Sequence, residues 1–227
     1  MADGARLTLP QGLLIALAAV VVFGGALWLA YRSQRKGAQL FEAFGKTRGW
    51  AYSRTDTQGL AANMQALIPS ERYTFDNILI SEEPGRKVIL FECGYRRADL
   101  QKVNSFGTGC LVEAPAFAKV KGPVEVVGRS WADAALLGGK APLGRPEFDG
   151  AFIVLAGEPD LVRDVLSPDL QNLLLAHAAA SLFNPARLVI GPSGAVVLTG
   201  YPADPERWDD LVNLAKRVEE TFRGAPS

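Results

Sequence analysis

The hydrophobic pattern separates one unbroken apolar segment from a much longer stretch in which apolar and polar residues alternate. Residues 13–31 read LLIALAAVVVFGGALWLAY and contain no charged side chain. About 20 apolar residues in a row match the hydrocarbon thickness of a bilayer, whereas a buried helix of a water-soluble domain carries a polar stripe. The pattern therefore predicts a transmembrane helix over residues 12–31, after a short N-terminal tail of residues 1–11.

The rest of the chain changes repeatedly between helical and strand spacing. Residues 37–48 have helical spacing that ends at Gly49, so we expect a juxtamembrane helix within residues 32–49. Further helices are expected at residues 60–67, 159–166 and 168–181 and from residue 204 onward, and strands at residues 50–52, 73–80, 87–95, 103–113, 124–127, 151–155, 187–190 and 195–199. Short turns with proline and glycine join neighbouring strands, which is typical of antiparallel hairpins. Residues 50–227 are therefore predicted to form one α+β domain with a mixed, mainly antiparallel sheet and flanking helices.

Aromatic and basic residues mark the C-terminal end of the predicted span, and they are the predicted membrane-interface residues. Trp28 and Tyr31 suit the headgroup level, and Arg32, Arg35 and Lys36 follow directly. Because the more basic flank of a span stays in the cytoplasm, we expect a single-pass protein of the bacterial inner membrane, with its N-terminus outside and its domain cytoplasmic. Two alternatives stay open: an inverted topology with a periplasmic domain, and a cleaved signal peptide.

Small residues on the predicted span indicate a surface for docking another helix. Gly24 and Gly25 leave bare backbone, and pairs of small residues four apart precede and follow them. Helix association in lipid depends on close van der Waals approach, so such a patch favours docking. The alternative interpretation is that glycine and alanine are simply common in membrane helices.

Charge balance and cysteine content exclude several classes of function. The chain has 24 Lys and Arg against 24 Asp and Glu, so nucleic acid is not an expected partner. Its two cysteines, Cys93 and Cys110, are too few for a disulfide scaffold or a thiolate metal site, and no cofactor is expected. The simplest interpretation is two buried, reduced thiols. If the strands that carry them pair and the geometry allows it, the two thiols are expected to bridge in an oxidising compartment and to stay reduced in the cytoplasm.

Two places carry side chains suited to acid–base chemistry. His177 is the only histidine, and it follows leucines at helical spacing, so we interpret it as a structural residue on an apolar helix face. Glu147 and Asp149 stand two residues apart before a predicted strand, where a solvated loop is the commoner explanation. Neither place has convergent partners in the sequence, so we expect no catalytic residue and no enzyme.

Three short stretches carry a resemblance to a known group of proteins. They are FEAFGKTRGWAYSRTD directly after the span, GRKVILFECGYR, and PEFDGAFIV. Through Gly49, Trp50 and Tyr52 in the first stretch and the Glu-Phe-Asp-x-x-Phe element of the last, the chain resembles a bacterial family of single-span, membrane-anchored domains of unknown function. The resemblance implies one membrane helix followed by one domain, and it implies no activity.

These observations lead us to expect a function that involves no catalysis. We expect a non-catalytic accessory subunit that stabilises or positions components of a larger integral-membrane assembly, with a respiratory or photosynthetic complex as the first guess. Trp50, Tyr52 and the segment 128–146, predicted as a loop or a brief helix at 131–137, are the expected protein-interaction surfaces. The alternative is a membrane-tethered binding or sensor domain with an apolar pocket for a lipid or small molecule.

Overall fold

The computed structural model describes residues 25, 28, 35–69, 71–97, 104–129, 142–180, 187–199 and 204–223. The chain divides into two units, Met1–Leu40 and Phe41–Ser227. Gly25 and Trp28 are the described residues of the predicted transmembrane helix, and both are helical. The rest of that helix lies outside the described residues. Within the ranges given above, no helix is both long enough and apolar enough to cross a membrane.

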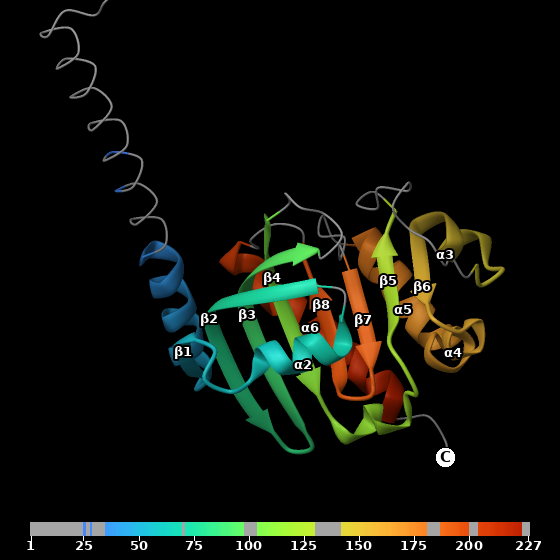
Figure 1. Cartoon of the computed structure of the whole chain (residues 1–227), viewed down its shortest axis with the longest axis horizontal. Coiled ribbons are helices and arrows are strands. Elements are labelled where there is room, and N and C mark those ends of the chain that lie inside the picture. The colour runs from blue at the N-terminus through green and yellow to red at the C-terminus, as the bar shows by residue number, and fades with distance from the viewer. Residues whose placement is uncertain are drawn as a thin grey trace, which may run out of the picture. The chain divides into compact units, whose positions relative to one another are not determined.

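One antiparallel sheet organises the second unit (Figure 1). Its strands lie in the order β1-β2-β3-β4-β8-β7-β5-β6. Their bounds are β1 (Ala51–Thr55), β2 (Glu71–Glu83), β3 (Arg86–Arg97), β4 (Asn104–Glu113), β5 (Val124–Gly128), β6 (Phe152–Ala156), β7 (Arg187–Gly191) and β8 (Gly194–Leu198). The predicted α+β class with a mainly antiparallel sheet is confirmed. The sheet is not mixed in its described part, because every pairing there is antiparallel.

Helices pack on both faces of the sheet. They are α2 (Leu60–Leu67), α3 (Pro146–Ala151), α4 (Pro159–Val165), α5 (Pro168–Ala180) and α6 (Trp208–Arg223), with short 3-10 helices η1 (Pro115–Lys119) and η2 (Pro205–Arg207). A further helix covers residues 35–48 and ends before Gly49, whose φ of 69° suits glycine. The predicted helices at 60–67, 159–166 and 168–181 are confirmed with bounds that agree to within one residue.

The short helix α3 corrects the expectation of a loop before β6. Pro146 lies in its first turn, and the carboxylate of Asp149 accepts hydrogen bonds from the backbone N–H groups of Leu143 and Gly144, each at 3.0 Å. A helix of six residues is too short to show a hydrophobic repeat, and Gly150 lowers its helix propensity. The alternative brief helix at 131–137 lies outside the described residues.

Each face of the sheet carries its own apolar core. One core joins side chains of α3, α4, α5 and α6 to one face, and it includes the apolar face of α6. The other core joins α2 to the opposite face. Figure 1 shows α2 in front of the sheet and α6 behind it. The sheet therefore has no face left without an apolar cover, and the eight-residue α2 contributes to the cover on one side.

Residues 41–48 attach the start of the second unit to α6. Phe41 is fully buried, and its ring centroid lies 4.1 Å from that of Trp208. Phe44 meets the same indole edge-on at 5.2 Å. Gly45 leaves no room for a side chain, because a Cβ there would collide with Leu79 of β2. The helix thus packs closely onto the domain through its aromatic residues.

Candidate functional site

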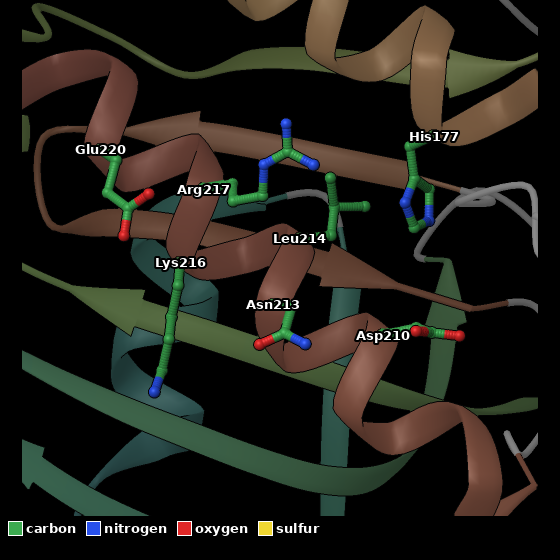
Figure 2. A pocket seen from close by; sticks show the side chains of 7 residues that line it. All are labelled: His177, Asp210, Asn213, Leu214, Lys216, Arg217 and Glu220. Carbon is green, nitrogen blue, oxygen red and sulfur yellow. The ribbon is translucent and has the colours of Figure 1, made fainter. Parts of the chain in front are cut away.

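A hollow of about 410 Å³ lies beside α5 and α6 (Figure 2). The lining residues on α6 recur every three or four positions, which places them along one stripe of that helix. The complete lining is His177 of α5 and Asp210, Asn213, Leu214, Lys216, Arg217 and Glu220 of α6. The hollow is therefore polar, unlike the apolar pocket expected of a lipid sensor.

His177 supplies the titratable ring of this hollow. Burial lowers the pKa of His177, the nearby Asp210 opposes that shift, and Arg217 adds to it. The imidazole is therefore neutral at neutral pH and offers one hydrogen-bond donor and one acceptor. The predicted structural histidine is half-buried rather than enclosed in an apolar face.

The neighbouring charges of the hollow are partly engaged by the β2–β3 turn. Lys216 donates a hydrogen bond to the carboxylate of Glu83, and the Glu220 carboxylate lies 3.4 Å from Nη1 of Arg86. No serine, threonine, cysteine or tyrosine lines the hollow, and the part of the chain that the structure describes contains no group of three His, Cys, Asp or Glu side chains placed to hold a metal ion. The arrangement is suited to hydrogen bonding and charge pairing.

Trp50 and Tyr52, the predicted protein-interaction residues, are half-buried against the α6 side of the domain. The Trp50 ring meets Phe44 edge-on with centroids 6.1 Å apart, and Nζ of Lys216 lies 5.9 Å from its centroid. Both predicted residues thus have contacts within the domain. Their role in binding a partner stays a prediction.

Tyr52 supports an unusual bend in β2. Its hydroxyl donates to Oδ1 of Asn77 at 2.8 Å, and Nδ2 of Asn77 donates to Oε2 of Glu92 at 2.5 Å. Asn77 has a φ of 51°, and the β2–β3 register shifts between Asp76 and Leu79. Burial raises the pKa of Glu92, the Asn77 hydrogen bond opposes this, and the cross-strand partner Asp76 adds to it. The hydrogen bond from Tyr52 therefore helps to hold the bulge of β2 in place.

A buried ionic network joins β2, β5 and β7. Arg187 and Glu71 are 5% and 3% exposed. Nη1 of Arg187 donates to Oε1 of Glu71 at 2.7 Å, and Nη2 donates to Oε2 of Glu125 at 3.0 Å. The hydroxyl of Tyr73 donates to Oε2 of Glu71 at 2.6 Å, and burial raises the pKa of Tyr73. The sequence contains no signal for this network, because a single charge at the start of a strand normally indicates an exposed end.

Cys93 and Cys110 are buried, free thiols, as expected, and the geometry excludes the bridge that was conditional on it. Strands β3 and β4 do pair, but Cys93 lies opposite Gly107 and Cys110 lies opposite Leu90. The two thiols also belong to different cores, Cys93 to that of α2 and Cys110 to that of α6. Side chains on opposite faces of a sheet point apart, so the pair cannot report on the compartment.

The remaining predicted residues are placed as follows. Asp149 accepts backbone N–H groups, as described for α3, while the Glu147 side chain is 79% exposed and lies 3.8 Å from Arg145. The two carboxylates therefore serve different contacts. Among the membrane-interface and helix-docking predictions, Tyr31, Arg32 and Gly24 lie outside the described residues, whereas Trp28, Gly25, Arg35 and Lys36 are helical and exposed.

Comparisons with known proteins bear on the fold. No protein-family model matches the chain, and no curated protein matches it. The fold is similar to the crystal structure of the mycobacterial trehalose monomycolate transport factor A, TtfA, with a TM-score of 0.55 and 14% sequence identity. The similarity covers 83% of this chain and 96% of that chain. At this identity it shows a shared fold alone.

Proposed function

We propose that the chain is a non-catalytic, single-span accessory subunit of the bacterial inner membrane that stabilises or positions components of a larger integral-membrane assembly. The observation that carries the proposal is how soon the domain begins after the apolar segment. Phe41 is already buried in the domain core. The ten residues from Tyr31 to Phe41 span at most about 35 Å when fully extended. The domain would therefore stay close to the membrane surface, within reach of an integral-membrane partner.

The chemistry of the described hollow supports a binding role over a catalytic one. Two of its charged groups, Lys216 and Glu220, bond to the β2–β3 turn, and its lining lacks a hydroxyl or thiol nucleophile. Such a surface suits recognition of a polar protein surface, since mixed charges add specificity to association. The second expectation, a domain with an apolar pocket for lipid, gains no support from this polar hollow.

We take a transport assembly as the setting of this role by analogy with the structural neighbour, since a shared fold does not itself determine a function. The neighbour is described as a transport factor for trehalose monomycolate. We infer that this chain likewise serves a membrane transport assembly as a supporting factor. The partner and the transported molecule would depend on which assembly the chain joins.

Co-purification from native membranes tests the proposal. The full-length chain with a C-terminal tag, extracted in mild detergent, should bring down integral-membrane proteins in stoichiometric amount. A chain whose residues 13–31 are replaced by an unrelated transmembrane segment is the matched control, because it keeps the domain and the anchor. Recovery of the tagged chain as a monomer with bound lipid would overturn the proposal in favour of a lipid-binding domain.

Protease added to intact spheroplasts tests the proposed topology. The basic residues Arg32, Arg35 and Lys36 favour a cytoplasmic domain, so the domain should resist digestion until the cells are lysed. A periplasmic reporter protein digested in the same sample is the control for protease access. Digestion of the domain in intact spheroplasts would assign the opposite topology.

A further inference from the structure

The contact between Glu71 and Arg187 joins two strands that are far apart in the sheet. β2 and β7 are second and sixth in the strand order, so four steps of about 4.8 Å would separate them by about 19 Å in a flat sheet. Nη1 of Arg187 nevertheless lies 2.7 Å from Oε1 of Glu71. The first half of β2 must therefore cross over the face of the sheet.

The bulge in β2 is where this crossing begins. Asn77 has a φ of 51°, a left-handed conformation that is uncommon for a residue with a side chain. The segment from Asp76 back to Glu71 covers about 17 Å at about 3.4 Å per residue, close to the separation of the two strands estimated above. Figure 1 shows the resulting sharp bend of β2 and β3. We call residues 71–75 of β2, with their register partners 93–97 of β3, the strap.

In the described residues, a single backbone ladder holds the strap to the rest of the sheet, where residues 93–96 of β3 pair with residues 104–107 of β4. In the described residues β1 pairs with β2 from Asp76 to Ile80, beyond the strap. On the other side, β4 pairs with β8 from Gly109 to Val112, also beyond the strap. The strap strands pair with each other and with the start of β4. Residues 71–75 have no described ladder to β1 or β7, so side-chain contacts determine whether they stay against β7.

The strongest of these contacts is the buried pair Glu71 and Arg187. Arg187 is held from the other side by Glu125, so it stays on β7 and β5 when Glu71 is removed. The other contacts are apolar and smaller: Phe75 meets Phe91 edge-on with centroids 5.2 Å apart. Because Glu125 still pairs with Arg187, neutralising Glu71 removes only the charge-assisted hydrogen bond between the strap and β7, and bonds of this kind contribute about 1.5–3 kcal/mol.

We propose that the strap is a moving part of the domain that opens about the bulge at Asn77, with the Glu71–Arg187 pair as its latch. Opening separates residues 71–75 from β7 and exposes the apolar core on the α2 side of the sheet. The α6 side keeps its core, because that core is formed on the opposite face. The inference concerns the domain alone and does not depend on the proposed accessory role.

The two cysteines are internal probes for this opening. Cys93 lies in the strap and is 3% exposed in the core shared with α2. Cys110 is fully buried in the core shared with α6. A maleimide reacts with either thiol only when the structure around it opens. Local opening of the strap therefore labels Cys93, whereas global unfolding labels both.

The test is the rate of N-ethylmaleimide labelling at each cysteine, read by mass spectrometry on the full-length chain in mild detergent. With Glu71→Gln, which loses the charge-assisted hydrogen bond to Arg187, we expect labelling of Cys93 to rise about tenfold or more while that of Cys110 stays unchanged. Amide hydrogen exchange of residues 71–75 should rise in the same variant, and that of residues 78–83 should not. Tyr73→Phe, which removes one hydrogen bond to Glu71, should give a smaller rise of the same selectivity and remains usable if Glu71→Gln does not fold.

A variant at the opposite end of the hairpin is the matched control. Arg86 bonds to Glu83 and to the fully buried Glu219 of α6, so Arg86→Gln weakens contacts on the Cys110 side. It should raise Cys110 labelling more than Cys93 labelling. Equal increases at both cysteines in the Glu71 and Tyr73 variants would mean that the network only stabilises the whole domain, and no increase at Cys93 would mean that it is no latch. Either result overturns the inference.

Discussion

Phe41 packs against Trp208 with ring centroids 4.1 Å apart, so the first turns of the domain rest on the first turn of its last helix. The two residues are both buried, at 0% and 2% exposure. Next to them, the guanidinium of Arg48 bonds to the carboxylate of Asp209. The N- and C-terminal elements of the domain therefore stabilise each other.

Truncation of Phe41 should destabilise the domain strongly. Phe41→Ala removes a fully buried ring and leaves a cavity beside Trp208, which costs about 3–5 kcal/mol in comparable cores. Urea denaturation in detergent, followed by tryptophan fluorescence, measures the loss in free energy of unfolding. Leu40→Ala is the neighbouring control, because Leu40 is 48% exposed and its loss should stay within about 0.5 kcal/mol. Equal effects of the two variants would contradict the packing described.

Cys93 and Cys110 should never form a disulfide within one folded chain. They face opposite sides of the sheet, and burial raises the pKa of each thiol to about 12, which suppresses the reactive thiolate. The measurement is mass spectrometry of the chain after oxidant treatment, without reduction. Oxidation in high urea, where the chain is unfolded, is the positive control. A bridged product from folded protein would contradict the strand register.

The local hydrophobic pattern predicts those elements whose apolar residues recur at regular spacing, and α6 is an example. Its 16 residues contain an apolar residue at nearly every third or fourth position, and the buried face follows that spacing. The hairpin of β2 and β3 is also predicted by the sequence, because Pro84 and Gly85 mark the turn between the two strands. Gly85 has the φ of 78° that such a turn requires.

The hydrophobic pattern of the sequence does not predict contacts between residues that are far apart in the chain. Glu71 and Arg187 are 116 residues apart, and their contact depends on a bend at Asn77 that no local rule places. The conditional bridge between Cys93 and Cys110 is excluded for a related reason: pairing of two strands does not fix the register, and the register decides which face each residue takes. The hollow beside α5 and α6 likewise arises from two separate helices that happen to meet.

Acid should destabilise the domain through His177. Burial lowers the pKa of His177 below its ordinary value near 6.5, so the unfolded chain takes up the proton first as the pH falls. The neutral ring therefore contributes its full stabilisation of the folded state above pH 6.5, the ordinary pKa. This stabilisation is lost as the pH falls from that value toward the lower pKa of the folded chain. Asp210 works against this shift and Arg217 with it.

The variant His177→Gln isolates this effect. Urea midpoints measured at pH 7.5 and pH 5.5 should fall less in the variant than in the unmodified chain, because glutamine does not titrate. Asn213→Ala changes the same hollow without a titrating group and is the matched control, with an unchanged pH dependence. Identical pH dependence of the unmodified chain and His177→Gln would contradict the assigned shift.

The last prediction concerns the transmembrane segment as a docking surface. If the chain is an accessory subunit, a partner helix should pack against Gly24 and Gly25, since association in lipid depends on close backbone approach. Changing both to leucine should then reduce co-purification of the partner while membrane insertion persists. Among the described residues, a Cβ at Gly25 meets no atom within 4 Å, so the substitution there has space. Val21→Leu with Val22→Leu is the control, and membrane fractionation of each variant checks insertion. Normal co-purification of the glycine variant would leave the helix as a tether only, and the contacts would then have to come from the domain, beginning with Trp50 and Tyr52.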